Sequence, residues 1–501
     1  MANVQSNNLS QAFDDAIGTR QEAIELLEEL HRVQPGDTKL QSQLAAEYHN
    51  LAREMLEKGL LSEAEPLVRK AISEQAEAVK ATSLPWQREF LGNHYRLLGT
   101  VLMQSNRLAE AADSLEHSLE IRAKLKKEHP AVPAYQLSVV EAITDMALTS
   151  TFQGEKVKAL AAANQALAEC EELATKSPRF MVHLANSLDC VASIEFNFQS
   201  DLKRGQALLE RSISIHRELW AQNAGIPAYR FNLAGALSNL ATSLENTDTE
   251  RAGQLYEEAL QLIAGLMGDF PDSREYYLRH SIIAHNLASI YRASGHHDAT
   301  VKVLRENYRV SHQLHERWPE VPQYAAIYAT AASHLAWSLT QVGENDEAKP
   351  LVTVAEPILA RFAGNGPQAK FEHLHALRCI ARLRRNDELS AALEQLKAVV
   401  AELRELGQLH PAISVIRVNQ ALVCFEVAET MTSDANLETH ELKARSQPFI
   451  DEGVQLCRQL QKENEAALVL ANLRSCADLP SLNAHEAFRQ LIADLRGEGK
   501  D

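Results

Sequence analysis

The chain has 501 residues and a formal net charge of −17, from 50 Lys and Arg residues against 67 Asp and Glu residues. Gly and Pro, with 20 and 16 copies, make up about 7% of the chain against roughly 12% in average proteins, which argues against sandwiches, barrels and propellers because these folds need many tight turns. The acidic balance disfavours nucleic acid and anionic membranes, which are bound through clustered Lys and Arg, and leaves basic partners open.

The N-terminal residues 1–10 are polar and lack the basic and then apolar segments of a signal peptide. We expect these residues to be disordered and the protein to be cytoplasmic. Helical periodicity begins at residue 11, and residues 11–34 are predicted to form a lone helix that caps one end of the fold.

Prolines recur at nearly constant spacing from residue 35 to residue 411, an interval of 376 residues in eight steps, or 47 residues per step on average. Around three of them the sequence repeats a related phrase, which reads HPAVPAY at 129–135, FPDSREY at 270–276 and WPEVPQY at 318–324. A fixed period indicates one small unit stacked many times rather than several independent domains. We expect Trp318 and Tyr324 to pack at the junction between two units.

Each step contains two stretches with helical periodicity. A small residue follows a Leu in the first helix, which would let the partner helix approach closely; this position holds Ala52, Gly99, Ala288 and Ala336. Gly or Asn then stands where a left-handed residue would end the helix; this position holds Gly59, Asn106, Gly295 and Gly343. Ser62 followed by Glu65 predicts a capping box at the start of one second helix.

These offsets resemble the tetratricopeptide repeat, a helix-turn-helix of 34 residues with the patterns W-x2-L-G-x2-Y and A-x3-F. Here the second helix continues for about 13 further residues before the next unit begins. The array is similar to the tetratricopeptide regions of bacterial serine/threonine-kinase-associated signalling proteins and to those of the kinesin-light-chain type. The resemblance implies an all-α fold, a right-handed α-solenoid or superhelix of stacked antiparallel helix pairs.

We expect residues 11–366 to form the regular array. Residues 367–480 are predicted to be a degenerate continuation, since Arg384 stands where an apolar residue belongs. Residues 481–501 would then supply a C-terminal capping helix and a charged tail. The uncharged run at 321–343 is long enough to span a bilayer, but its polar residues favour a buried helix, so no membrane contact is predicted.

We find no nucleotide-binding, zinc-protease, hydrolase or kinase signature. The sequence therefore predicts neither an enzyme nor a cofactor site. His312 and His315 share a helix face at a spacing that a metal could use, but no carboxylate completes the set, so no metal is predicted. The six cysteines show no paired spacing and are expected to be free thiols; they are Cys170, Cys190, Cys379, Cys424, Cys457 and Cys476.

In tetratricopeptide arrays the first helix of each pair lines a concave groove. The resemblance therefore implies a partner-binding set beside the small packing residues: His49, Asn50, Arg53, Arg96, Thr100, Ser238, Asn239, Thr242, His285, Asn286, Ser289, Ser333, His334 and Trp337. Only Arg53, Arg96 and the asparagines partly match the Lys/Asn/Lys/Arg set with which some tetratricopeptide domains clamp a carboxylate, so such a clamp is not predicted. The short basic run at 382–385 is interpreted as a solvated helix face.

The leading hypothesis is a non-catalytic scaffold for protein–protein interaction, binding a protein or peptide in the concave groove and serving bacterial signalling or complex assembly. A regulatory sensor that responds to a peptide or metabolite is an alternative. An all-α enzyme is a third, because function depends on sites rather than on the fold that carries them. The sequence leaves the oligomeric state open.

Overall fold

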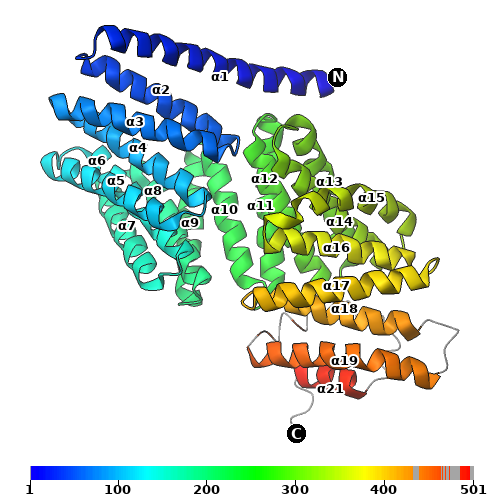
Figure 1. Cartoon of the computed structure of the whole chain (residues 1–501). Helices are drawn as coiled ribbons and strands as arrows, with labels where there is room; N and C mark the ends of the chain where they lie inside the picture. Colours follow the sequence, from blue (N-terminus) through cyan, green and yellow to red (C-terminus); the bar gives the residue numbers. More distant parts are fainter. Residues whose placement is uncertain are drawn as a thin grey trace. The chain divides into compact units, whose positions relative to one another are not determined.

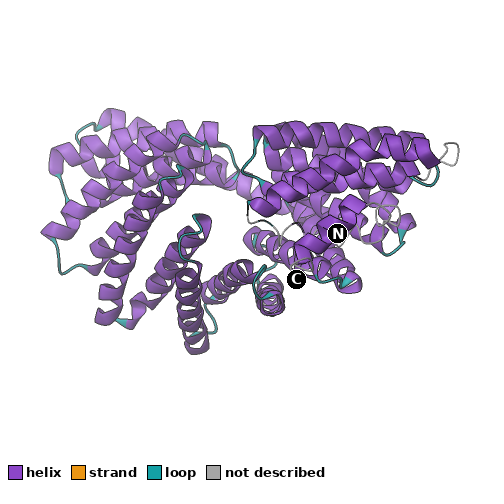
Figure 2. Ribbon diagram, turned by 90° about the horizontal axis from the view of Figure 1, so that it is seen from below, coloured by secondary structure: helices purple, strands orange, loops and turns teal. Residues whose placement is uncertain are grey.

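The computed structural model describes residues 2–432, 439–463, 465, 469, 473 and 486–496. Within these ranges every regular element is a helix, as Figure 2 shows. The predicted all-α class, a stack of antiparallel helix pairs, is therefore confirmed. Contacts divide the chain into two compact units, Met1–Ser243 and Leu244–Asp501, and each unit is described by itself.

The N-terminal unit opens with the long helix α1 (Ala2–Val33) and continues as helix pairs (Figure 1). The first and second helices of the pairs are α2 (Thr38–Glu57) and α3 (Leu61–Thr82), α4 (Pro85–Gln104) and α5 (Leu108–Glu128), α6 (Pro133–Phe152) and α7 (Lys156–Lys176), and α8 (Met181–Asn197) and α9 (Leu202–Gln222). A short 3-10 turn at Pro178–Phe180 precedes α8, and α10 (Pro227–Leu244) follows α9.

The C-terminal unit repeats the same arrangement. It begins with α11 (Thr249–Asp269). Its pairs are α12 (Arg274–Ala293) and α13 (His297–Arg317), α14 (Pro322–Gln341) and α15 (Asn345–Phe362), α16 (Pro367–Arg384) and α17 (Leu389–Leu409), and α18 (Ser414–Thr432) and α19 (Thr439–Lys462). A 3-10 turn at Ala363–Asn365 precedes α16, and α21 (Glu486–Arg496) is the last described helix.

Proline sets the start of most first helices. Because its ring fixes φ and it has no N–H, proline fits the first helical position, where an N–H has no helical partner. It occupies this place in α4, α6, α10, α14 and α16. The first helices begin at residues 38, 85, 133, 181, 227, 274, 322, 367 and 414.

The turns between paired helices follow the sequence prediction. Gly59, Asn106, Gly295 and Gly343 all have positive φ, at 74°, 58°, 76° and 83°. A left-handed residue at this place ends the first helix and turns the chain back for the second. The predicted turn positions are confirmed.

The close approach of paired helices is confirmed as well. Ala52, Ala288 and Ala336 are buried. At Gly99, a Cβ atom would lie 2.7 Å from Cγ and 2.8 Å from Cδ2 of Leu115 on the partner helix α5. Only a residue without a side chain leaves room for Leu115 there.

The apolar core runs from helix to helix rather than filling one centre. In the N-terminal unit one cluster extends from Ile17 on α1 to Ala111 on α5, and in the C-terminal unit another extends from Ala288 on α12 to Cys379 on α16. At the junction before α14, the ring centres of Trp318 and Tyr324 lie 6.5 Å apart. The ring centres of Trp318 and Tyr277 lie 5.8 Å apart, so the predicted aromatic packing between two successive repeats is confirmed.

Two local expectations are wrong. Helix α1 begins at Ala2, so the disorder expected for residues 1–10 is not found in residues 2–10, which contain no Gly or Pro to stop a helix. The second helix α3 begins at Leu61 with Leu60 at its N-cap, so Ser62 cannot cap it. Glu65 binds Arg69 and Arg107 at 2.8 and 2.7 Å instead.

The regular pairing continues past residue 366, through α16 and α17 to α18 and α19. The division between compact units falls instead after Ser243. The predicted C-terminal capping helix coincides with α21, while residues 481–485 and 497–501 lie outside the described residues. The uncharged run at 321–343 forms α14, which is buried along most of its length as predicted. None of the described helices combines the length and apolar character needed to cross a membrane.

Candidate partner-binding face

The first helices line the inner side of each unit. Successive first helices contact one another, α2 with α4 and α6 with α8 in one unit, α12 with α14 and α14 with α16 in the other. Within the described chain no two successive second helices pack as closely. In a curved stack the inner helices are the closer ones, so the first helices form the concave side of each unit.

Polar side chains join several of the first helices to the next first helix in the same unit, and we call this set the inner ladder. Its partners come from successive repeats, 38 to 49 residues apart in sequence. The contacts are His49 with His94, Arg96 with Glu141 and Asp145, Asn186 with Asn232, His334 with Glu372, Ser333 with His375, and Arg378 with Glu426 and Asn419.

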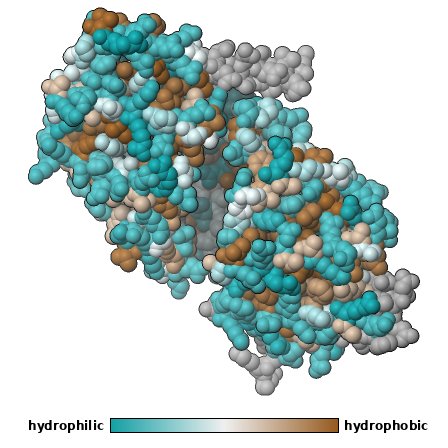
Figure 3. Space-filling view, viewed as in Figure 1, coloured by the Kyte–Doolittle hydropathy of each residue, from teal (hydrophilic) through white to brown (hydrophobic). Residues whose placement is uncertain are grey.

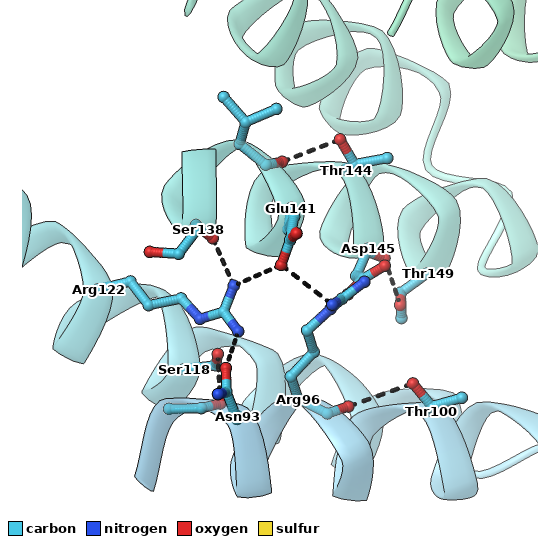
Figure 4. A network of polar contacts seen from close by, with 12 residues as sticks. Asn93, Arg96, Thr100, Ser118, Arg122, Ser138, Glu141, Thr144, Asp145 and Thr149 are labelled. Atoms are coloured by element: carbon cyan, nitrogen blue, oxygen red, sulfur yellow. Dashed lines mark hydrogen bonds and ion pairs between the residues drawn. The ribbon is translucent and has the colours of Figure 1, made fainter. Parts of the chain in front are cut away.

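In the N-terminal unit the ladder centres on two arginines that point at one carboxylate (Figure 4). Arg122 of α5 is only 1% exposed and donates to Glu141 Oε2 at 3.3 Å, to the carbonyl oxygen of Ser138 at 2.5 Å and to Oδ1 of Asn93 at 2.6 Å. Arg96 of α4 donates to the same Glu141 oxygen at 3.1 Å. Three successive helices are thus joined through one glutamate.

The charges of this network are balanced. Burial alone would lower the pKa of Arg96, but its hydrogen bond to Asp145 and the negative charge of Glu141 outweigh that cost and raise it. Burial lowers the pKa of Arg122, and the charge of Glu141 partly offsets the effect. These groups already satisfy one another, so this part of the ladder holds α4, α5 and α6 together.

Two histidines continue the ladder to α2. The Nδ1 atoms of His49 and His94 lie 3.0 Å apart, so one ring donates a hydrogen bond to the other. Burial lowers the pKa of His94 to about 3 and that of His49 to about 4. Both rings are therefore neutral at pH 7, and a neutral imidazole has one nitrogen that donates and one that accepts.

In the C-terminal unit three histidines of α12, α14 and α16 are in contact, His285 edge to face with His334 and His334 stacked on His375. The ring centres of His285 and His334 lie 4.7 Å apart and those of His334 and His375 lie 4.5 Å apart. His334 Nε2 is 2.9 Å from a carboxylate oxygen of Glu372. Gln368 donates to the other oxygen of Glu372 at 2.6 Å, so this buried carboxylate is fully engaged.

Beside the histidines, two arginines lie over one indole. The guanidinium carbons of Arg378 and Arg382 are 4.3 and 5.2 Å from the centre of the Trp337 ring. Arg378 holds both oxygens of Glu426, at 2.8 and 2.9 Å, and Arg382 lies 3.7 Å from the same carboxylate. Cation–π contact and ion pairing together fix the planes of these side chains.

The predicted partner-binding residues divide by exposure. Two are exposed, Arg53 and Thr242, and eight are partly exposed, His49, Asn50, Arg96, Thr100, Asn239, His285, Asn286 and Ser289. The other four are buried, so their expected exposure to a partner is wrong: Ser238, Ser333, His334 and Trp337. In the last three the reason is α16, whose side chains cover this part of α14.

Sequence reasoning missed several inner-face residues, among them Arg292, Glu372, His375 and Arg378. The last three lie on α16, where the repeat motif had faded, and Arg292 lies one helical turn beyond the predicted set. A polar residue every third or fourth position on a first helix was the available signal. The solvated-face interpretation holds for Arg384, which is exposed, but Arg382 is part of the site.

Among the described residues no group of three or more His, Cys, Asp or Glu side chains could hold a metal ion. His312 and His315 lie against Tyr328 instead, at 5.0 and 5.8 Å between ring centres. The five described cysteines are free thiols as predicted, and Cys476 lies outside the described residues. Burial raises the pKa of Cys190 to about 11 and that of Cys379 to about 12, which leaves both thiols protonated and unreactive at neutral pH.

No protein-family model matches the chain, and no curated protein matches it in sequence. Solved structures with a similar arrangement of helices include BtubC (BKLC) from P. vanneervenii, with 19% identity, a TM-score of 0.41 and coverage of 51% of this chain and 93% of that one. The apo form of RapI matches at 12% identity and a TM-score of 0.43, over 91% and 99% of the two chains. A Rap protein complexed with Competence and Sporulation Factor matches at 13% identity and 0.36, over 77% and 99%. Values this low assign neither a family nor a function.

Proposed function

We propose that the chain is a non-catalytic scaffold that binds a protein or peptide along its first helices, in bacterial signalling or complex assembly as the repeat resemblance implies. One observation carries the proposal. Within each unit, partly exposed polar side chains stand beside the inner ladder on the first helices, among them Asn50, Thr100 and Asn239 in the N-terminal unit and Asn286 in the C-terminal unit. Such a row offers hydrogen bonds at regular intervals to an extended or helical ligand.

The inner ladder supports this role because it holds the helices that carry the exposed row. Side chains on helices that are already held in place lose less conformational entropy when a partner binds. Figure 3 shows hydrophilic residues with apolar ones among them on the side of the molecule that faces the viewer. The partly exposed side chains beside the inner ladder are mainly amides and hydroxyls, so polar contacts would supply much of the specificity.

The state of the buried carboxylates favours binding over catalysis. Glu372 accepts hydrogen bonds from His334 and Gln368, and Glu426 accepts two from Arg378. A general acid or base must be able to reach the proton that it transfers. These carboxylates are instead occupied by fixed structural partners.

Site-specific photo-crosslinking tests the proposal. A photoreactive residue would replace Asn50 or Asn286 on the first helices, and in matched controls it would replace the exposed Glu116 or Glu306 on the second helices. We expect a discrete crosslinked partner from the first-helix positions only. Crosslinks confined to the second-helix positions would overturn the assignment of the binding face.

A further inference from the structure

Arg292 on α12 is a cation without a counter-charge. Its side chain is partly exposed, and it donates one hydrogen bond, to the hydroxyl of Ser289 at 3.3 Å. Among the residues that the structure describes, no carboxylate oxygen lies within 4 Å of its guanidinium, the distance that defines an ion pair. This contrasts with Arg122 and Arg378, which both meet a carboxylate.

The neighbouring carboxylates are already taken. Glu426 is held by Arg378 and Arg382, and Glu372 by His334 and Gln368. Counting charged groups, three guanidinium ions, of Arg292, Arg378 and Arg382, face two carboxylates. One positive charge is left over on this face of an otherwise acidic protein.

The surroundings of Arg292 make its unpaired positive charge unfavourable. Burial lowers the pKa of Arg292, the positive charge of Arg378 lowers it further, and Glu372 offsets only part of the effect. Arginine nevertheless stays charged in proteins. Burial lowers the pKa of His285 to about 3 and that of His375 far below its usual value, so both rings are neutral at pH 7 and polar. A poorly solvated, unpaired charge is unfavourable until an anion joins it.

We propose that Asn286, Ser289 and Arg292 form a binding site for an oxyanion, the carboxylate or phosphate of a bound peptide. The three residues are spaced three apart on α12, so they share one helix face. An amide, a hydroxyl and a guanidinium are all donors to oxyanions, and arginine binds them with two parallel hydrogen bonds. All three side chains are partly exposed, which leaves the site open to a ligand. The inference rests on the proposed binding function and adds the chemistry of the ligand.

The free anions test the site without knowledge of the partner. The intact protein is titrated with acetate or with inorganic phosphate, at ionic strength held constant with chloride, and thermal unfolding and calorimetric binding are measured. We expect a saturable rise in Tm and a binding isotherm for at least one anion. Arg292→Met should weaken that binding at least tenfold and abolish the rise in Tm.

The same variant has a second signature. With chloride alone, Arg292→Met should unfold at the same temperature as the wild type or higher, because it removes an uncompensated charge. Arg309→Met is the matched control, since Arg309 is an exposed arginine of α13 paired with Glu306. It should keep the full anion response. A response retained by Arg292→Met, lost equally in Arg309→Met, or absent from the wild type for both anions would overturn the site.

The two anions also separate the two ligand sources. A response to phosphate alone supports a phosphorylated peptide, and a response to acetate alone supports a side-chain or C-terminal carboxylate. If crosslinks from Asn50 identify a partner whose affinity is unchanged by Arg292→Met, the oxyanion site is wrong while the proposed function stands. If anions bind but no partner crosslinks to the first helices, the proposed function fails and the anion site remains.

Discussion

Arg378 on α16 donates two hydrogen bonds to the carboxylate of Glu426 on α18, 48 residues further along the chain, at 2.8 and 2.9 Å. Both side chains are buried, with Arg378 only 4% exposed. A buried ion pair stabilises a fold little more than an apolar pair of the same shape would. Removing one partner, however, leaves an uncompensated buried charge, which is strongly destabilising.

Glu426→Ala should therefore lower the free energy of unfolding by about 3–5 kcal/mol, because the charge of Arg378 would lose its buried counter-ion. Denaturant unfolding measures the change. The matched control is Glu452→Ala, which breaks a pair of the same separation and similar geometry with the exposed Arg404. That variant should lose at most about 1 kcal/mol. If both variants lost the same free energy of unfolding, burial of the Arg378–Glu426 pair would not explain the loss.

Gly99→Ala should destabilise the N-terminal unit by about 1–3 kcal/mol, because its Cβ atom would lie 2.7 Å from Leu115 Cγ and force the paired helices apart. Gly235→Ala on α10 is the control, since a Cβ atom there meets nothing within 4 Å. It should be neutral or stabilising by up to about 1 kcal/mol through helix propensity. Thermal unfolding of both variants measures these changes in stability. A Gly99→Ala variant more stable than the wild type would contradict the close approach of α4 and α5.

The buried His94 should make stability depend on pH. Burial lowers the pKa of His94 from its usual 6.5 to about 3, so below pH 6.5 the unfolded chain takes up a proton that the folded protein resists. Stability should then fall as the pH drops from about 6.5 toward 4, by up to ~1.4 kcal/mol per pH unit for this one group.

His94→Gln tests this by urea unfolding between pH 4 and 8. The stability of the variant should depend less on pH than that of the wild type. The glutamine side chain still offers His49 a polar partner. His117→Gln, at an exposed position of α5, serves as the control and should keep the wild-type profile. An identical slope in His94→Gln and in the wild type would exclude His94 as a source of the acid sensitivity.

Ala288→Asp should unfold the repeats around α12 and weaken partner binding. Ala288 is 2% exposed and packs in the cluster that reaches from α12 to α16. An unpaired carboxylate there should cost on the order of 3 kcal/mol or more. Hydrogen exchange should show lost protection from α12 to α15 and unchanged protection from α2 to α5, because repeats are stabilised by their neighbours.

Ile282→Asp is the control on the same helix, since Ile282 is 54% exposed. A substitution there should change stability by no more than about 0.5 kcal/mol. Unchanged thermal unfolding of Ala288→Asp would mean that the alignment of the repeats is displaced on α12.

The sequence predicted the features that depend on local conformation. A left-handed turn favours Gly or Asn whatever surrounds it, and Gly59 and Asn106 both adopt it. The first position of a helix accepts proline for reasons internal to the backbone, as at Pro133 and Pro322. These preferences act over four or five residues, so one sequence is enough to reveal them.

The predictions that failed depend on neighbours distant in sequence. Ser333 and His334 were expected to be exposed because their own helix leaves them uncovered, but His375 and Glu372 of α16 reach them. The capping box at Ser62 is a local exception: the N-cap of α3 is Leu60, two residues before the predicted cap, and the helix begins at Leu61.

Arg378 and Glu426 were missed for a related reason. Each looks like an ordinary charge on a helix surface until α18 packs against α16. Their 48-residue separation corresponds to one step of the array, but the motif that defines the step has decayed in this part of the sequence. Pairing of charges across one repeat length is a signal that a sequence search could have included.

The inner ladder has a mechanical consequence. Each hairpin of helices is bonded mainly to the hairpins before and after it, so a pull on the two ends of the chain loads these bonds in series. In an optical trap the structure should unfold one helical hairpin at a time, beginning at an end of the array. Each step should release about 47 residues, which lengthens the extended chain by roughly 15 nm. The largest forces should mark the steps that break Arg378 from Glu426 and Arg122 from Glu141.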